Sequence, residues 1–227
     1  MQQDDTIDRT VVNVCGAVPQ FSMANEHLPS IMYGVRTRES QKILAVLGGG
    51  DQAFALLSLG STVVGIDGEY DAVNWVRARA NCAREGNYEG FLAVHAPCAS
   101  ERWQKREQRR REFFSPKRFA RIRANIDNLQ LVRTLFQKLP RELHIQYDSI
   151  YLSNILGWVK GAERAASMRV LQDLVNMQPR GGRVYSAVPE VLDIDGLKFC
   201  ATVSERVRNA HKVSPAVSWK PSVYRKH

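Results

Sequence analysis

The sequence has few cysteines and histidines, and neither type is grouped. Its four cysteines form no CxxC pair, which argues against a disulfide framework and favours reduced thiols in a cytoplasmic protein. The five histidines include no pair at metal-ligand spacing on a helix, so we expect no metal site. These residues are Cys15, Cys82, Cys98 and Cys200, and His27, His95, His144, His211 and His227.

Long apolar runs are also missing. No stretch approaches the roughly 20 apolar residues of a membrane-spanning helix, so we expect no transmembrane segment. The first ten residues, MQQDDTIDRT, are polar and acidic, which argues against a signal peptide. There is no internal repeat and no low-complexity segment. With 227 residues, of which 44% are hydrophobic, the chain is long enough for one domain with a substantial core.

The positive charge is concentrated in one segment. The formal net charge is +9, and residues 102–123 hold ten basic residues against two glutamates, a net +8. Trp103, Phe113, Phe114 and Phe119 lie among these cations. The segment fits three interpretations: a nucleic-acid contact with stacking aromatics, a helix on an anionic membrane, or a solvated helix face whose apolar side packs on the domain.

A glycine turn stands at the centre of the strongest pattern. Residues 43–48, ILAVLG, form an apolar run typical of a buried parallel strand, and 51–60 predict a short helix that ends at Gly60. Residues 62–67, TVVGID, predict a second strand, and 69–85 a second helix. This order predicts a βαβ unit with GGGD in its first turn.

The rest of the chain continues the alternation. Residues 100–139 have a helical pattern throughout, broken at Ser115-Pro116, with apolar residues at steps of three and four that include Leu129, Val132 and Phe136. We also predict strands at 147–156 and 183–189, a helix at 162–177, and an edge hairpin in the last forty residues around FCATV. The fold class is therefore α/β, with a mostly parallel sheet flanked by helices. Residues 1–40 would form an N-terminal cap or lid, and 41–227 one Rossmann-like domain with a helical insertion at about 88–140.

The chemistry of the turn indicates its ligand. Gly48-x-Gly50-x-x-Ala53 fits a loose dinucleotide pattern, but Asp51 would repel a pyrophosphate at the start of the following helix. S-adenosylmethionine has no phosphate and carries a sulfonium and an ammonium, which an acid attracts. Asp67, at the end of the second strand, would accept hydrogen bonds from both ribose hydroxyls. A plain tight turn and a helix cap are the structural alternatives for the glycines and Asp67.

The stretch ILAVLGGGDQAFALLSLGSTVVGID, 43–67, resembles motif I and the following acidic strand end of class I S-adenosylmethionine-dependent methyltransferases. YDSIYLSNILGWV, 147–159, and YEGFLAV, 88–94, are similar to betaine-lipid synthases, which transfer the 3-amino-3-carboxypropyl group of S-adenosylmethionine. Those lipid enzymes are longer. A related group of small enzymes cyclises S-adenosylmethionine to azetidine-2-carboxylate, which suits a short chain. The resemblance implies a Rossmann-like class I methyltransferase fold and S-adenosylmethionine as cofactor or substrate.

This resemblance implies attack on the methionyl Cγ–S bond with release of methylthioadenosine, by cyclisation or by transfer to a small acceptor. One alternative is methyl transfer to a small molecule or to RNA. A second alternative is a non-catalytic protein that binds nucleic acid or a ligand. The Asp/Asn-Pro-Pro-aromatic tetrapeptide common in amino-group nucleic-acid methylases is absent, and SNIL stands in its place.

The candidate site residues follow from these motifs. Asn154 would orient the reacting amine, with Tyr151 and Ser153 beside it, although strand alternation places Asn154 on the other face unless the strand ends early. Tyr185 would lay its ring against the sulfonium or hydrogen-bond the substrate carboxylate. Tyr33 and Arg36 would form a lid in which Arg36 holds the substrate carboxylate. Each also has a structural alternative: a turn cap, a core tyrosine or a surface arginine. The expected cofactor-binding residues are Gly48, Gly49, Gly50, Asp51, Asp67, Gly68, Glu69, Tyr33 and Arg36.

Overall fold

The computed structural model describes residues 23–24, 26–94, 101–188, 190–212 and 220–227. Its centre is a seven-stranded sheet of order β3-β2-β1-β4-β5-β7-β6. The strands β1 to β5 are parallel, and β7 is antiparallel to both β5 and β6. The strands are β1 (Lys42–Val46), β2 (Thr62–Asp67), β3 (Leu129–Arg133), β4 (Ser149–Tyr151), β5 (Arg183–Ser186), β6 (Leu197–Phe199) and β7 (Ser222–Lys226).

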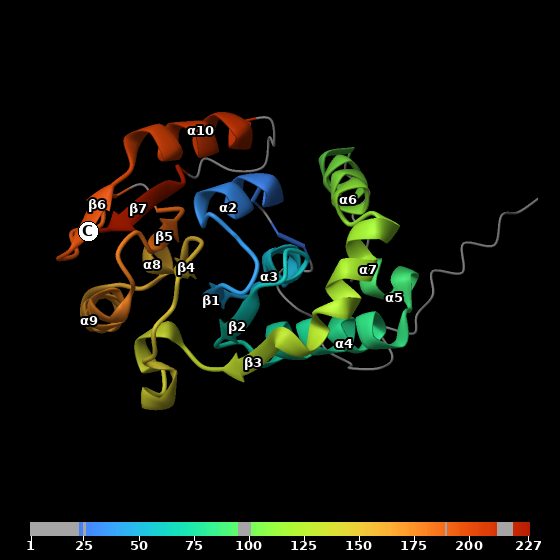
Figure 1. The fold of residues 1–227 in the computed structure, drawn as a ribbon, viewed down its shortest axis with the longest axis horizontal. Coiled ribbons are helices and arrows are strands. Elements are labelled where there is room, and N and C mark those ends of the chain that lie inside the picture. Colours follow the sequence, from blue (N-terminus) through green and yellow to red (C-terminus); the bar gives the residue numbers. More distant parts are fainter. Residues whose placement is uncertain (1–22, 25, 95–100, 189, 213–219) are drawn as a thin grey trace, which may run out of the picture.

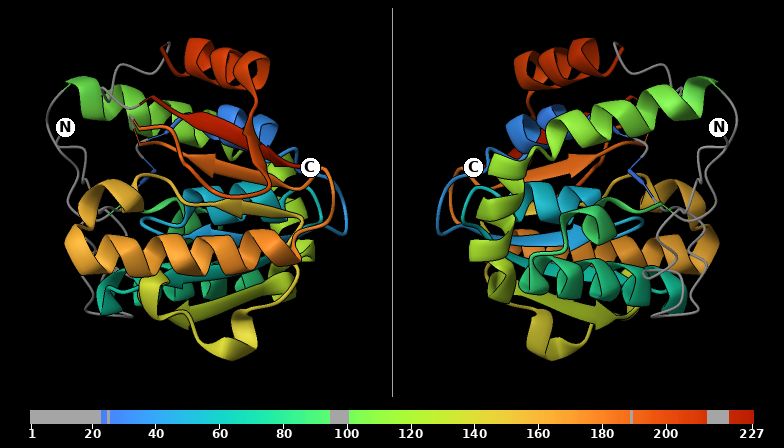
Figure 2. Two further views of the ribbon diagram at one scale, coloured as in Figure 1. Left: turned by 90° about the vertical axis from the view of Figure 1, so that its left-hand side faces the viewer. Right: turned by 90° about the vertical axis from the view of Figure 1, so that its right-hand side faces the viewer.

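Helices cover both faces of the sheet, as Figure 1 shows. One side carries α3 (Asp51–Leu57), α4 (Tyr70–Glu85), α5 (Tyr88–Leu92) and α7 (Pro116–Ala124), together with α2 (Leu28–Gly34). The other carries α8 (Ile155–Trp158) and α9 (Gly161–Met177), with the short 3₁₀ turns η2 (Phe136–Lys138) and η3 (Arg141–Leu143). Two further helices, α6 (Glu101–Phe113) and α10 (Ala201–Lys212), lie at the top of both views in Figure 2, and η1 (Ile126–Asn128) precedes β3.

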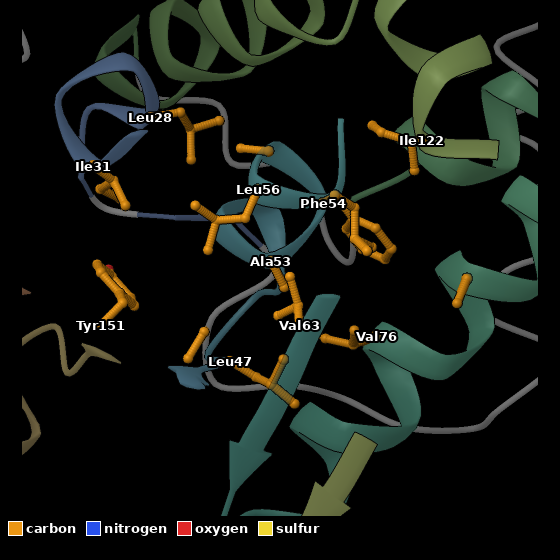
Figure 3. Close-up of a cluster of buried hydrophobic side chains, with 14 of the residues drawn as sticks. Leu28, Ile31, Leu47, Ala53, Phe54, Leu56, Val63, Val76, Ile122 and Tyr151 are labelled. Atoms are coloured by element: carbon orange, nitrogen blue, oxygen red, sulfur yellow. The ribbon is translucent and has the colours of Figure 1, made fainter. Parts of the chain in front are cut away.

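The core is divided by the sheet into two clusters, because successive side chains of a strand point to opposite faces. Ile43 and Ala45 of β1 belong to the cluster under α2, α3 and α4, whereas Leu44 belongs to the cluster under α9. Figure 3 shows the first cluster, with Phe54 of α3 and Ile122 of α7 directed into it. Continuous apolar strands are therefore required, since both faces are covered.

The predicted α/β fold is confirmed. The bounds of three predicted elements also agree to within one residue with the structure: strand 62–67 with β2, helix 69–85 with α4 and helix 162–177 with α9. The break at Ser115-Pro116 is also present, because α6 ends at Phe113 and α7 begins at Pro116. Helices α5, α6 and α7 occupy much of the predicted insertion. The domain limits themselves stay a prediction.

Three predicted elements are corrected by the structure. Residues 129–133 are not helical but form β3, which pairs with β2 from Val63↔Leu129 to Asp67↔Arg133. The predicted strand 147–156 is shorter, since β4 ends at Tyr151. FCATV does not form a hairpin, because it spans the end of β6 and the start of α10. Strand β6 does pair with β7 in antiparallel fashion, but α10 lies between the two strands in the sequence.

Candidate functional site

A cavity of about 470 Å³ runs along the carboxyl ends of β3, β2, β1 and β4. Strand order reverses between β1 and β4, and this switch point is where open α/β sheets bind ligands. Leu135 and Phe136 line the β3 end, Asp67 the β2 end, Gly48 and Gly49 the β1 end. Tyr151, Ser153 and Asn154 line the β4 end. The cavity therefore suits an elongated ligand that crosses four strand ends.

The charge of this cavity is negative. Four acidic side chains line it, Glu26, Asp67, Glu69 and Asp71, whereas no lysine, arginine or histidine of the described residues does. A phosphate-bearing ligand would meet only like charge here, whereas a cationic ligand would be attracted. The rim includes apolar side chains, among them Leu135 and Trp158, the second 67% exposed.

The glycine turn is shaped by local geometry and by Asp67. Gly50 has φ +82°, and a Cβ there would come within 2.5 Å of Val76 Cγ2, so only glycine fits. Asp67 accepts hydrogen bonds from the backbone N–H groups of Gly48 (2.9 Å) and Glu69 (3.0 Å). Burial raises the pKa of Asp67, while these two bonds act in the opposite direction. The carboxylate thus braces the β1 and β2 ends of the cavity that it lines.

Asp51 does not line the cavity, which corrects its predicted role beside the ligand. It is 1% exposed, and its Oδ1 pairs with Arg79 at 2.8 Å and with Arg110 at 2.9 Å. Its Oδ2 accepts the backbone N–H of Ala24. Burial alone would raise the pKa of Asp51, but the charges of Arg110 and Arg79 and the hydrogen bonds lower it.

The two arginines connect Asp51 to three further segments. Arg79 of α4 donates to the carbonyls of Gly49 (2.7 Å) and Phe91 (3.0 Å). Arg110 of α6 donates to the carbonyl of Leu92 at 2.6 Å. The buried cluster of Asp51, Arg79 and Arg110 therefore holds the glycine turn, α5 and α6 together from behind the cavity.

A buried carboxyl that the sequence analysis did not single out lies at the β4 end. Glu26 is 6% exposed and lines the cavity. Its Oε1 accepts hydrogen bonds from the hydroxyls of Tyr151 and Ser153, both at 2.6 Å. Its Oε2 has no partner among the described residues. Burial raises the pKa of Glu26, and the hydroxyls of Ser153, Tyr151 and Tyr185 only partly offset that effect.

The predicted catalytic residues are mostly brought together. Strand β4 ends at Tyr151, and Ser153 has a positive φ of +50°. The alternation of side chains therefore stops before Asn154, and Tyr151, Ser153 and Asn154 all line the cavity. Tyr185 is fully buried and lies behind the cavity, with its ring centroid 5.3 Å from that of Tyr151. Its hydroxyl is near enough to Glu26 to influence that pKa, but it does not line the cavity.

The predicted cofactor residues divide into two groups. Gly48, Gly49, Asp67, Gly68 and Glu69 line the cavity, whereas Gly50 and Asp51 support the turn from behind. Tyr33 and Arg36 are exposed and form no lid. They lie at the amino ends of the strands, since Arg183, the first residue of β5, donates to the carbonyl of Tyr33. Tyr33 lies instead under the guanidinium of Arg206 on α10.

A second cavity of about 340 Å³ adjoins the first. Met23, Ala24 and Glu26 line both cavities. On its far wall are Arg106, Arg109 and Arg110 of α6. Arg106 also donates to the carbonyl of Ala24 at 2.9 Å, so α6 supports the segment that carries Glu26.

Within the described residues, no three His, Cys, Asp or Glu side chains gather as a metal site would require. None of the described helices is both long enough and apolar enough to span a membrane.

No protein-family model matches the sequence, and no curated protein matches it. Solved structures do match. TrmN from Thermus thermophilus superimposes with a TM-score of 0.52 at 13% identity, over 96% of this chain and 53% of that one. An rRNA methylase from Streptococcus thermophilus gives 0.48 at 10% identity, over 87% and 94% of the two chains.

The N-methyltransferase NodS from Bradyrhizobium japonicum, in complex with S-adenosyl-L-homocysteine, also gives 0.48 at 10% identity, over 98% of this chain and 99% of that one. At such identities the superposition on TrmN shows a shared fold. Together with the strand order, it confirms the predicted Rossmann-like class I methyltransferase fold.

We predict that Asp51→Asn lowers the free energy of unfolding by about 3–5 kcal/mol, because it leaves two buried arginines without their carboxylate. Urea unfolding at pH 7 measures the change. Asp127→Asn is the matched control, since Asp127 pairs with Arg84 where the two side chains are 90% and 45% exposed. A loss for Asp51→Asn no larger than the control's would show that the cluster does not stabilise the fold.

We predict that Glu26 makes the ligand-free protein less stable as pH rises above 4.5, the ordinary pKa of its carboxyl. A carboxyl whose pKa is raised on folding stabilises the fold below its unfolded value, and that contribution is lost as pH rises through the folded pKa. Glu26→Gln removes this titration, so its stability relative to the wild type should increase with pH in urea unfolding between pH 4 and 8.

The matched control is Glu205→Gln, at an exposed position on α10. A stability difference for Glu26→Gln that varies with pH no more than the difference for the control would contradict the raised pKa.

Proposed function

We propose that this protein is an S-adenosylmethionine-dependent transferase, and that methyl transfer to a small molecule or to RNA is its reaction. The observation that carries the proposal is the acidic lining of the cavity, which holds four carboxyl side chains and, among the described residues, no lysine, arginine or histidine. A sulfonium compound without phosphate satisfies that charge. The fold shared with TrmN supports the proposal at the level of architecture.

The cavity suggests an order for the parts of this ligand. The adenine would lie by Leu135 and Phe136 beyond β3, and the ribose hydroxyls would donate to Asp67 at the end of β2. The methionyl group would cross the backbone of Gly48 and Gly49. The sulfonium then falls towards the β4 end, where Tyr151, Ser153 and Asn154 are gathered.

In this arrangement Asn154 would orient the reacting group, and the hydroxyls of Tyr151 and Ser153 would hold Glu26 in place. Displacement at a sulfonium carbon requires about 3–3.5 Å between the reacting atoms and an in-line approach. The attacking atom gains a carbon, and the sulfur leaves with the electron pair as a neutral thioether.

Attack at the methionyl Cγ is the second candidate, by cyclisation or by aminocarboxypropyl transfer. One observation favours it. The segment 147–159, which is similar to betaine-lipid synthases, contributes three polar residues to the cavity: Tyr151, Ser153 and Asn154. The same sulfonium activates both carbons, so the bound geometry selects between them.

The test is incubation of the purified protein with S-adenosylmethionine, alone and with panels of small acceptors or bulk RNA, followed by chromatography of the nucleoside product. Methyl transfer is expected to give S-adenosylhomocysteine only when an acceptor is present. Methylthioadenosine without an acceptor would favour cyclisation over methyl transfer. Failure to bind S-adenosylmethionine in calorimetry, with binding of ATP or NAD instead, would refute the proposal.

We further predict that Asp67→Asn weakens S-adenosylmethionine binding by about tenfold or more, because the ribose loses a charged hydrogen-bond acceptor. Calorimetry measures the affinity. Asp173→Asn, on an exposed position of α9 away from the cavity, is the control and should leave the affinity unchanged. An unchanged affinity in a folded Asp67→Asn variant would remove Asp67 from the ribose site.

A further inference from the structure

Glu26 stands out because it combines deep burial with an incomplete set of hydrogen bonds. A buried carboxylate oxygen without a partner is rare in folded proteins, and each case calls for a physical reason. Oε1 accepts hydrogen bonds from two hydroxyls at 2.6 Å, whereas Oε2 has no hydrogen-bond partner among the described residues. The nearby hydroxyl of Tyr185 affects the pKa of Glu26 but is itself without a hydrogen-bond partner there. The carboxyl lines the ligand cavity, so a bound molecule can supply the missing donor.

The two hydroxyl donors determine which oxygen is left for a ligand. Tyr151 and Ser153 both donate to Oε1, so that oxygen has little room for a proton. Oε2 is the oxygen that accepts a hydrogen bond when the carboxyl is ionised and holds the proton when it is neutral. A ligand group opposite Oε2 of the ionised carboxylate must therefore carry a hydrogen.

The position of Glu26 adds a second constraint. It lies at the β4 end of the cavity with Tyr151 and Ser153, at the opposite end from Leu135 and Phe136 beyond β3. Under the proposed function this is the end where the sulfonium and the attacking atom meet.

From this position the geometry points to Glu26 as the catalytic residue that binds the attacking amine through Oε2 and takes its proton. This inference rests on the proposed function and names its substrate class: the nucleophile is a neutral amine. The amine is either that of a separate acceptor or the α-amine of S-adenosylmethionine itself.

The step balances without any further reactant. The amine lone pair forms an N–C bond to the sulfonium carbon, the C–S bond breaks, and its electron pair stays on sulfur. The nitrogen, now positively charged, gives one proton to Oε2 of the Glu26 carboxylate. The products are an alkylated neutral amine, a neutral thioether and a protonated Glu26.

Other nucleophiles fit this site less well. An alcohol or a carbon acid must begin to lose its proton before or during attack, whereas a neutral amine attacks first, and its alkylated ammonium then gives a proton readily to a carboxylate. An anionic nucleophile would be repelled by Asp67, Glu69 and Asp71, which line the same cavity.

Three ligands test the contact by calorimetry without turnover. 5′-Methylthioadenosine has no aliphatic amine, S-adenosylhomocysteine has the α-amine, and sinefungin has both the α-amine and an amine-bearing carbon in place of the methylsulfonium. Glu26→Gln keeps the size of the side chain and an oxygen for Tyr151 and Ser153. It should weaken an amine-bearing ligand about tenfold or more, as loss of a charged hydrogen bond does, and leave methylthioadenosine unchanged.

The pattern identifies the source of the amine. If affinity for S-adenosylhomocysteine already falls, Glu26 is assigned to the α-amine of S-adenosylmethionine. If only affinity for sinefungin falls, Glu26 lies beside the position of the transferred methyl, which is where the amine of a separate acceptor would approach. The matched control is Glu69→Gln, which removes a charge at the ribose end and should change the three affinities by similar factors. Should Glu26→Gln fail to fold, Glu26→Asp withdraws the carboxylate by one methylene and tests the same contact.

Equal factors for all three ligands in the Glu26 variant would overturn the inference, and so would wild-type turnover with hydroxyl or carbon acceptors alone. Where the wild type turns over with an amine, Glu26→Gln should lower the rate about 100-fold or more, as loss of a general base does. A wild-type protein that binds none of the three ligands would refute the proposed function instead, so the two failures are distinguishable.

Discussion

The Asp51 carboxylate is the constraint on which the site depends. It lies in the first turn of α3, immediately after the glycines, and binds guanidinium groups from α4 and α6. Buried charges are costly unless they are paired and hydrogen-bonded, and here each partner is also bonded to backbone carbonyls. Through Arg79 the cluster reaches the carbonyl of Gly49, so the turn that lines the cavity is fixed from the side away from the ligand.

This cluster also explains part of the basic segment 102–123. Arg110 is buried against Asp51, and Arg106 donates to the carbonyl of Ala24. Arg118 lies 3.8 Å from the ring centroid of Phe113, while Arg111 pairs with Glu89 and Glu107. Several of the cations thus pack α6 and α7 onto the domain and support the chain that carries Glu26. The packing interpretation of the segment therefore has direct support for these residues, and the interleaved Phe114 and Phe119 are core side chains.

The sequence predicts best where its signals are local. Apolar runs, a glycine that no other residue can replace and a terminal acid define β1, α3, β2 and α4 within 44 residues of one another. Residues 129–133 show the limit. Leu129, Val132 and Phe136 have helical spacing, yet pairing with Val63 to Asp67 of β2 makes residues 129–133 a strand. Tertiary pairing overrides a short periodic pattern of this kind.

The site residues show the same limit over longer separations. Asp51 was placed correctly beside the turn, but its partners come from 28 and 59 residues away, and no local signal says that they neutralise it. Glu26 has no motif at all, and its partner Tyr151 is 125 residues distant. A lone glutamate in a polar segment becomes notable only when its burial is known. Tyr33 and Arg36 were misplaced because a segment before the first strand can reach either end of the sheet.

The acidic cavity and the buried Glu26 act on each other under the proposed function. In the empty cavity, burial favours the neutral carboxyl, and the uncharged hydroxyls of Tyr151 and Ser153 only partly offset this. A sulfonium compound brings positive charge to the same end, and a nearby cation favours the ionised carboxyl and lowers its pKa. Cofactor binding therefore generates the base at the place where an amine must lose its proton. The reaction ends with a neutral thioether, so the cation is consumed and the protonated Glu26 is again the favoured form. The same desolvation that makes Glu26 costly for the empty protein thus couples its proton affinity to the charge of the bound cofactor.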